Sequence, residues 1–136
     1  MDPIADMITH IKNASLAGRD SVLINYSNIK KDIAEVLKSE GYVKNVEKKS
    51  KGAKNFLSID LIFDNESPSV GTKQIPKIKG VKRLSKPSKR MYKKAGEIRA
   101  VRQGYGIMVL STPKGVMPGY KAKKAGLGGE ALFSIW

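Results

Sequence analysis

The sequence predicts an α+β protein of two small domains, the first of order α-β-α-β-β and the second mostly antiparallel β with a short helix. Two observations lead to this prediction. The spacing of apolar residues switches between the helical period and strict alternation within the first 66 residues. The charge then changes, because residues 1–66 hold 10 Lys/Arg and 10 Asp/Glu whereas residues 67–136 hold 16 and 2. We therefore expect a neutral domain at 1–66 and a basic domain at 67–136.

The first domain is expected to begin with a helix from residue 3 to about residue 16, for which Asp2 is a suitable N-cap. Isoleucines recur on one face of this helix. The alternating stretch SVLINY at 21–26 predicts a short strand. Ser27 then caps a second helix that Gly41 ends. A hairpin follows, with the strands YVKNVEKK and FLSIDLIF on either side of the turn SKGAKN.

Residues 64–73, DNESPSVGTK, have the composition of a linker and coincide with the change in charge. Beyond them we expect a bent strand over 75–84, a turn at SKPSK and a strand at RMYKKA. EIRAVRQG is expected to form a short helical turn, and the apolar run YGIMVL a strand buried on both faces. After the loop STPKG, a short helix near GYKAKKAG and the strand EALFSIW complete the basic domain.

The composition limits the cellular compartment and the kind of binding partner that we expect for this protein. The chain has no Cys, so disulfides and thiolate metal sites are excluded. We expect a soluble cytoplasmic protein, since no stretch approaches the roughly 18 apolar residues of a membrane span and no signal-like run opens the chain. The net charge of +14 predicts a polyanionic partner. Nucleic acid is the favoured partner, and an anionic membrane surface is the alternative.

No catalytic or cofactor motif is complete. STPKG and GLGG contain the residues of a phosphate loop but not its order, and GYG opens a strand where a dinucleotide motif would open a helix. His10 is the only histidine, and the two acids of the basic domain, Glu97 and Glu130, lie far apart in the sequence. We therefore expect no enzyme activity, no cofactor, no bound metal and no small-molecule substrate.

The loop STPKG has the chemistry of an RNA contact. The hydroxyls of Ser111 and Thr112, on a loop after a rigid strand, can bond base edges and 2′-hydroxyls, while Lys114 neutralises phosphate. A plain polar turn would have the same composition, because turns favour Ser, Thr, Pro and Gly. Both interpretations stay open from these residues alone.

Two further residues of the basic domain have alternative interpretations. Glu130 either accepts hydrogen bonds from loop amides or base amino groups, or pairs with Lys123 or Lys124. Tyr92, in KRMYKK, either stacks on a sugar or base or packs in the domain core.

Blocks along nearly the whole chain resemble the bacterial small-subunit ribosomal protein S8 family, namely DPIADMITHIKNA, EGYV, KRLSKPSKRMY, YGIMVLSTPKGVM and KAKKAGLGGEALFSIW. The resemblance implies a protein that binds an internally looped helix in the central domain of small-subunit rRNA early in assembly. It also implies contacts with neighbouring small-subunit proteins and, in some bacteria, repression of its own operon through an mRNA mimic. A basic architectural DNA-binding protein is the alternative, and it would carry a recognition helix or apolar wedges.

The resemblance also assigns residues by position. The residues of the main RNA surface are Ser111, Thr112, Pro113, Lys114, Gly115, Tyr92, Gly128, Gly129, Glu130, Lys123 and Lys124. Those of secondary RNA contacts are Lys12, Asn13, Lys30, Lys31 and Lys86. Pro113 departs from the Ser or Asn usual in the family and removes a backbone donor. We expect Glu130 to buttress the 111–115 loop from the neighbouring strand.

Overall fold

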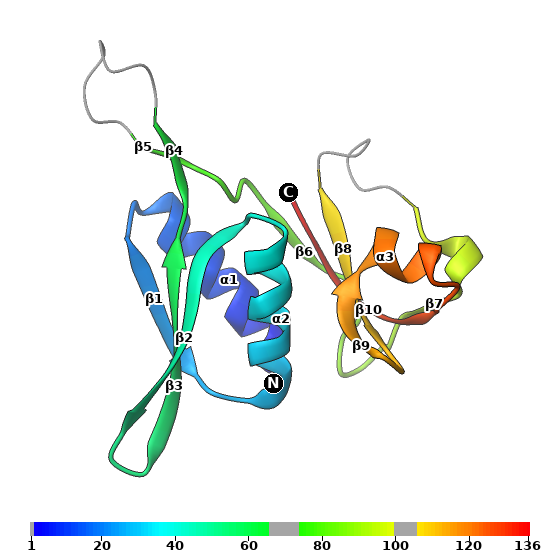
Figure 1. Ribbon diagram of the computed structural model, residues 1–136, viewed down its shortest axis with the longest axis horizontal. Helices are drawn as coiled ribbons and strands as arrows, with labels where there is room; N and C mark the ends of the chain where they lie inside the picture. Colours follow the sequence, from blue (N-terminus) through cyan, green and yellow to red (C-terminus); the bar gives the residue numbers. More distant parts are fainter. Residues whose placement is uncertain (1, 66–73, 100–105) are drawn as a thin grey trace. The chain divides into compact units, whose positions relative to one another are not determined.

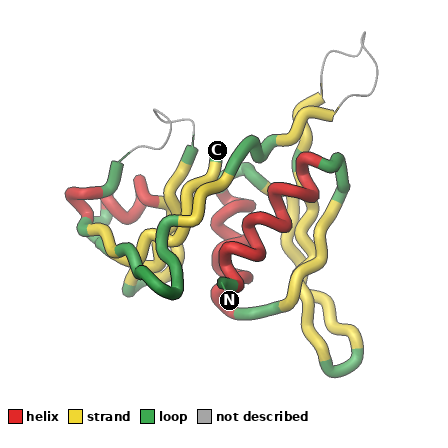
Figure 2. The backbone as a smooth tube through the Cα atoms, turned by 180° about the vertical axis from the view of Figure 1, so that it is seen from behind, coloured by secondary structure: helices red, strands yellow, loops and turns green. Residues whose placement is uncertain are grey.

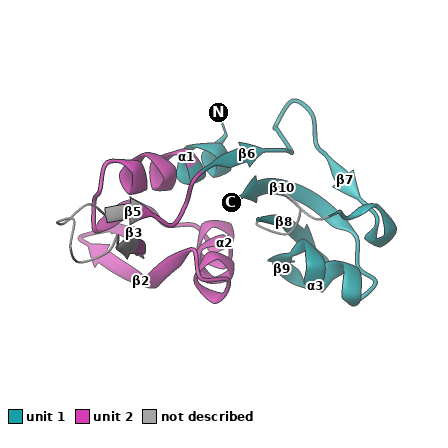
Figure 3. Cartoon of the chain, turned by 90° about the horizontal axis from the view of Figure 1, so that it is seen from above, with its two compact units in different colours: residues 1–8, 80–136 teal, residues 9–79 magenta. Residues whose placement is uncertain are grey.

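The structure is a computed structural model in which residues 2–65, 74–99 and 106–136 are described. Its contacts divide the chain into two compact units, Met1–Ile8 with Gly80–Trp136 and, separately, Thr9–Lys79 (Figure 3). The predicted α+β class is confirmed. The domain boundary predicted within 64–73 falls mostly outside the described ranges and stays a prediction.

The unit Thr9–Lys79 is built on a three-stranded antiparallel sheet of order β1-β3-β2. Its strands are β1 (Ser21–Asn25), β2 (Val43–Lys51) and β3 (Lys54–Leu61). Alternate residues of β1 and β3 are buried, and Figure 2 shows the helices on one side of the sheet. The alternation that predicted both strands therefore corresponds to one buried face of each.

Two helices accompany this sheet, α1 (Pro3–Leu16) and α2 (Asn28–Ser39), and the division between the units falls within α1. The predicted cap of α2 is confirmed, because the Ser27 hydroxyl accepts a hydrogen bond from the Lys30 amide at 3.2 Å. Gly41, with φ of 82°, follows the end of α2 in the left-handed conformation that glycine tolerates.

The sequence did not predict the short ladder of β4 (Phe63–Asn65) and β5 (Gln74–Pro76). Its first rung places Phe63 opposite Pro76. Asp, Asn and Pro have low strand propensity, which is why this stretch was expected to be a linker. The rest of the predicted linker, residues 66–73, lies outside the described residues.

The C-terminal strands form a sheet of order β6-β10-β8-β9, in which β7 also pairs with β10 (Figure 1). The elements are β6 (Val81–Arg83), β7 (Tyr92–Lys93), β8 (Ile107–Thr112), β9 (Gly115–Pro118), α3 (Gly119–Lys124), β10 (Gly129–Ile135) and one 3₁₀ turn, η2 (Ala95–Glu97). Leu110 of β8 packs with Ala122 of α3 and with Ile98 in a buried cluster. β10 pairs with β6, β7 and β8 and is thus the central strand of this sheet.

Three predicted elements of the basic half need correction. The bent strand expected over 75–84 is two short strands, β5 and β6, separated by a loop. The strand predicted at YGIMVL continues to Thr112, so Ser111 and Thr112 belong to β8 and not to a loop. A helical turn was predicted at EIRAVRQG, residues 97–104, but the structure has a 3₁₀ turn earlier, at Ala95–Glu97. The predicted stretch is described only through Arg99. Residues 100–105 lie outside the described ranges.

An ion pair joins the start of the chain to β6. Arg83 Nε lies 2.9 Å from one carboxylate oxygen of Asp2 and Arg83 Nη2 lies 3.3 Å from the other, while Nη1 donates to the Leu132 carbonyl. The Arg83 side chain is only 8 % exposed. A guanidinium this buried needs an opposite charge close by, and the bidentate geometry supplies it.

Asp2 has a second partner, because it accepts a hydrogen bond from the Ala5 amide at 3.2 Å and so caps α1 as predicted. Burial raises the pKa of Asp2, but the hydrogen bonds from Arg83 and Ala5 and the charge of Arg83 outweigh burial and leave that pKa below its ordinary value of 3.8. The ionised form is therefore stabilised by folding.

We expect Asp2→Asn to lower the free energy of unfolding at neutral pH and to make it less sensitive to acid. The stabilisation from ionised Asp2 is fully present above pH 3.8 and is lost as the pH falls through the lower pKa of the folded state. Urea unfolding at a series of acidic pH values measures this change. The control Asp6→Asn removes an exposed acid of the same helix that makes no ion pair within the described ranges. Equal effects of the two substitutions would contradict the expectation.

Candidate nucleic-acid interface

The register of three strands aligns three of the predicted RNA-surface residues across the sheet. Glu130 of β10 lies opposite Tyr92 of β7 on one side and opposite Ser111 of β8 on the other. Directly opposed residues of antiparallel strands share a face of the sheet, so these three side chains form one row. Leu110 packs against Ala122 of α3, and its neighbour Ser111 therefore lies on the face away from α3.

Two glycines allow β10 to lie between β7 and β8. A Cβ atom on Gly128 would lie 2.6 Å from the carbonyl oxygen of Lys93, and one on Gly129 would overlap the carbonyl oxygen of Ser111. Neither glycine has a positive φ, so the requirement is space and not an unusual backbone conformation. The role of the Gly-Gly pair is therefore the close approach that brings Tyr92 and Ser111 into one row.

The Glu130 side chain binds the segment before β7, which corrects the expectation that it buttresses residues 111–115. Its Oε2 accepts hydrogen bonds from the Ser85 hydroxyl at 2.5 Å and from Arg90 Nη1 at 3.2 Å. The alternative pairing with the lysines of α3 is also wrong within the described residues. Ser85 is fully buried and accepts in turn from the Met91 amide at 3.1 Å. Glu130 thus fixes the backbone directly before Tyr92.

The turn between β8 and β9 is closed by Thr112. Its hydroxyl donates to the Gly115 carbonyl at 2.7 Å and accepts from the Lys114 amide at 3.2 Å, so it braces the turn. Gly115 has φ of 117°, a conformation that L side chains rarely adopt. Pro113 and Lys114 are exposed at the tip, and Ser111 makes no side-chain hydrogen bond within the described part of the chain.

Tyr92 is 69 % exposed, so the alternative that it packs in the core is wrong. Lys86 is also exposed and lies on a tight turn, in which Lys86 and Lys89 exchange two backbone hydrogen bonds of 2.9 Å. Lys123 and Lys124 are exposed on α3, which packs on the other face of the sheet from the Tyr92 row. The structure therefore brings Tyr92 and Ser111 together but does not add the α3 lysines to their row.

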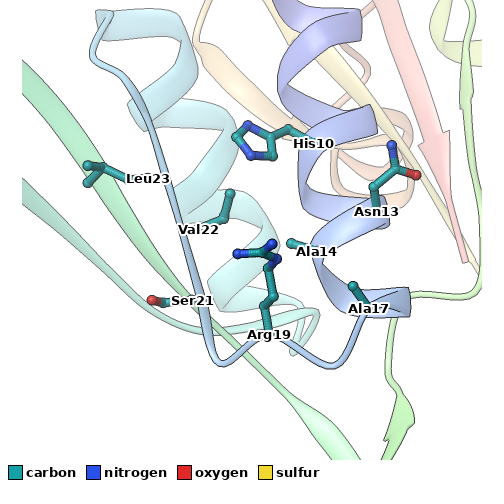
Figure 4. Close-up of a pocket in the computed structure, with 8 residues that line it drawn as sticks. All are labelled: His10, Asn13, Ala14, Ala17, Arg19, Ser21, Val22 and Leu23. Carbon is teal, nitrogen blue, oxygen red and sulfur yellow. The ribbon is translucent and has the colours of Figure 1, made fainter.

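The predicted secondary contacts belong to the other unit, apart from Lys86. A groove of about 480 Å³ lies there between α1 and β1, and Figure 4 shows the side chains of His10 and Arg19 extending into it. Asn13 lines the groove, whereas Lys12, Lys30 and Lys31 do not. No acidic residue lines it, so it has no carboxylate to work with His10 in catalysis. Its lining residues are His10, Asn13, Ala14, Ala17, Arg19, Ser21, Val22 and Leu23.

No group of three or more His, Cys, Asp or Glu within the described residues is placed to hold a metal ion. No described helix is long and apolar enough to cross a membrane.

Sequence reasoning missed Ser85 and Arg90. A signal was present, because an acid among so many cations needs partners, but the 16 basic residues of the second half did not single out Arg90. Ser85 was assigned to a turn, where a buried serine is not expected. The pairing depends on how the chain folds back from β6 to β7, which no local pattern encodes.

We expect Gly129→Ala to destabilise the protein by about 1–3 kcal/mol, because the added methyl group must displace the backbone of β8. Gly96→Ala is the matched control, since a Cβ atom there meets nothing within 4 Å and its φ is not positive. Urea unfolding of both variants measures the difference. Equal stability of the two variants would show that β8 moves away at no cost.

Comparison with known proteins identifies the family of the chain. A family model described as Ribosomal protein S8 matches residues 2–136. The small ribosomal subunit protein uS8 of Heliobacterium modesticaldum is 45 % identical over 135 residues, which cover 99 % of this chain and 97 % of the relative. The proteins of the same name from Staphylococcus saprophyticus and from a Nitratiruptor species are 42 % and 39 % identical, over 99 % of this chain and 97 % and 98 % of the relatives. The resemblance read from the sequence blocks is confirmed, and the chain belongs to the ribosomal protein S8 family.

Proposed function

We propose that the chain is a structural protein of the small ribosomal subunit and binds small-subunit rRNA through Tyr92, Ser111 and the turn at Pro113 and Lys114. The observation that supports this most is the row in which an exposed aromatic ring and a hydroxyl flank one fixed carboxylate. The relatives are named as small ribosomal subunit proteins. Membership of this family, which is not one of enzymes, agrees with a structural role at the cytoplasmic ribosome.

Each part of this surface has a distinct physical task. Tyr92 offers a ring on which a base can stack. Lys114, at the exposed tip of the turn, neutralises phosphate and so adds affinity without sequence preference. Ser111 offers a hydroxyl to a base edge or a 2′-hydroxyl. Glu130 acts indirectly, by holding Ser85 and Arg90 so that the backbone leading into Tyr92 keeps one position.

The chemistry of the surface also indicates the form of the RNA. An exposed ring needs a base that is not already stacked, and an internal loop supplies one where a regular duplex does not. We propose that the target is an internally looped helix in the central domain of the rRNA, bound early in subunit assembly. Neighbouring small-subunit proteins are further proposed partners. An mRNA segment that folds into the same loop would bind the same surface, and such binding would repress translation of the protein's own operon.

The alternative of an architectural DNA-binding protein has no support from this geometry. The only α-helix described wholly within the unit of Met1–Ile8 and Gly80–Trp136 is α3, which has six residues. It packs against β8 and η2 and is too short to act as a recognition helix.

We expect Tyr92→Ala to weaken binding of the looped rRNA helix by about 1–3 kcal/mol, the scale of one lost base stack, with the salt dependence unchanged. Lys114→Ala is expected to weaken the looped helix and a scrambled helix alike, and to make the salt slope shallower by somewhat less than one unit. Filter binding across a salt series, with duplex DNA as competitor, measures both. Equal affinity for DNA and rRNA would contradict the proposed function.

Glu130→Gln tests whether the carboxylate positions Tyr92. The substitution removes a negative charge near phosphate, so simple electrostatics predicts tighter binding to any RNA. We expect weaker binding of the looped helix instead, because the ion pair with Arg90 is lost and the segment before Tyr92 loosens. Glu97→Gln is the matched control, since it removes one charge from an exposed residue of the same unit and keeps the acceptor used by the Lys94 amide. A gain in affinity with both variants would contradict the positioning role.

A further inference from the structure

The first 66 residues carry equal numbers of acidic and basic residues, but the fold does not distribute them evenly. Between Lys48 and Ile59 the chain has four lysines and no acid. These lysines, Lys48, Lys49, Lys51 and Lys54, all lie on the β2–β3 hairpin and are all exposed. We call residues 49–54 the basic tip.

The basic tip extends beyond the three-stranded part of its sheet. β1 pairs with β3 only from Phe56 to Asp60, whereas β2 pairs with β3 as far as the rung between Lys51 and Lys54. The last rungs and the turn therefore have no third strand beside them within the described residues. Figures 1 and 2 show the hairpin projecting past the helices of the same unit.

Three of the four lysines, Lys49, Lys51 and Lys54, lie on one face of the hairpin. Lys49 and Lys51 are two residues apart on β2, Lys51 lies opposite Lys54, and Lys49 lies opposite the half-buried Phe56. Directly opposed like charges destabilise a strand pair. None of these lysines makes an ion pair within the described ranges. The repulsion at the tip is therefore uncompensated in the free protein and would be relieved by an anion.

The base of the hairpin is anchored, so the backbone that carries the lysines is held in place. The Tyr26 amide donates to the Asn55 carbonyl at 3.0 Å, and the Ser50 hydroxyl bonds the Asn55 side chain at 2.8 Å. The ammonium group of Lys48 lies 4.4 Å from the centre of the Tyr26 ring. A ligand that binds such a preorganised tip loses less affinity to the cost of ordering the backbone.

We propose that the basic tip is a second RNA contact, which neutralises phosphates independently of the Tyr92 surface. The inference rests on the proposed function, because the RNA is the same small-subunit rRNA. Lys49 and Lys51 are spaced by about 6.7 Å along the strand, which suits successive phosphates of one chain. Lysine binds phosphate as a point charge, and it is depleted from interfaces between proteins, so RNA fits the tip better than an acidic protein does.

The first test compares two triple variants with the unmodified chain. One changes Lys49, Lys51 and Lys54 to Gln, and the other changes Lys38, Lys44 and Lys77, which are exposed lysines of the same unit away from the tip. Affinity for transcribed full-length small-subunit rRNA is measured across a salt series. We expect the tip variant to bind on the order of tenfold or more weakly, with a salt slope shallower by roughly 2 to 3 units, and the control variant to bind almost normally.

The melting temperature of the free tip variant separates lost binding from misfolding. Removal of the opposed lysines is expected to leave it equal or higher, because the repulsion between them is gone. Equal losses of affinity in the two triple variants would overturn the proposal, since they would show a general effect of charge. Unchanged affinity of the tip variant would also overturn it. If Tyr92→Ala still weakened binding, the proposed function would survive that result, and failure of the unmodified chain to bind rRNA would reject the proposed function itself.

The absence of cysteine permits a second test. Ala53→Cys, in the turn of the hairpin, gives a single attachment site for a hydroxyl-radical source, and Ser39→Cys at the end of α2 is the control. We expect cleavage of rRNA at defined positions from the hairpin site and none at those positions from the control. Labelling of a neighbouring protein in assembled subunits, without rRNA cleavage, would overturn the RNA assignment in favour of an acidic protein partner.

Discussion

The lack of space for a side chain at Gly128 and Gly129 is the constraint on which the candidate RNA surface depends. Because β10 approaches the backbones of both Lys93 and Ser111 there, one strand joins β7 and β8 into a single row of side chains. A larger residue would move apart the aromatic ring and the hydroxyl that the register otherwise places on either side of Glu130. The surface is thus produced by backbone packing, and the side chains named for RNA binding depend on residues that need not touch RNA.

Arginine and lysine have different tasks in this chain. The half-buried carboxylates Asp2 and Glu130 each pair with an arginine, whose planar fork can bond a carboxylate while also reaching a carbonyl, as Arg83 does. The lysines of the turns, of α3 and of the basic tip are exposed, and an ammonium group on a flexible stem suits phosphates whose positions vary. Structural pairing and the proposed binding of phosphate therefore draw on separate sets of cations.

Local patterns predicted the fold well and the contacts of the candidate site less well. The Ser27 cap, the alternation in β3 and the Gly41 stop are local effects, so short windows of sequence contained them. The partners of Glu130 could not be found in this way, because Ser85 is 45 residues away and many cations were available. Strand β8 was expected to end two residues earlier, so the hydrogen bond by which Thr112 closes the turn to β9 was not predicted. The net charge of residues 1–66 is zero, and this sum did not reveal the cluster of hairpin lysines because it ignores where each charge lies in the fold.

The position of β10 makes the sheet of this unit depend on one strand. β10 pairs with β6, with β7 and with β8, whereas no two of these three strands pair with each other within the described ranges. The Leu132 carbonyl of β10 also accepts from Arg83, and Trp136 exchanges two backbone hydrogen bonds with Gly80. Without β10, the β8–β9 pair is the only described ladder of this sheet that remains. The Tyr92 row therefore forms only when β10 has docked, so the residues that hold β10 in place also control whether the candidate surface exists.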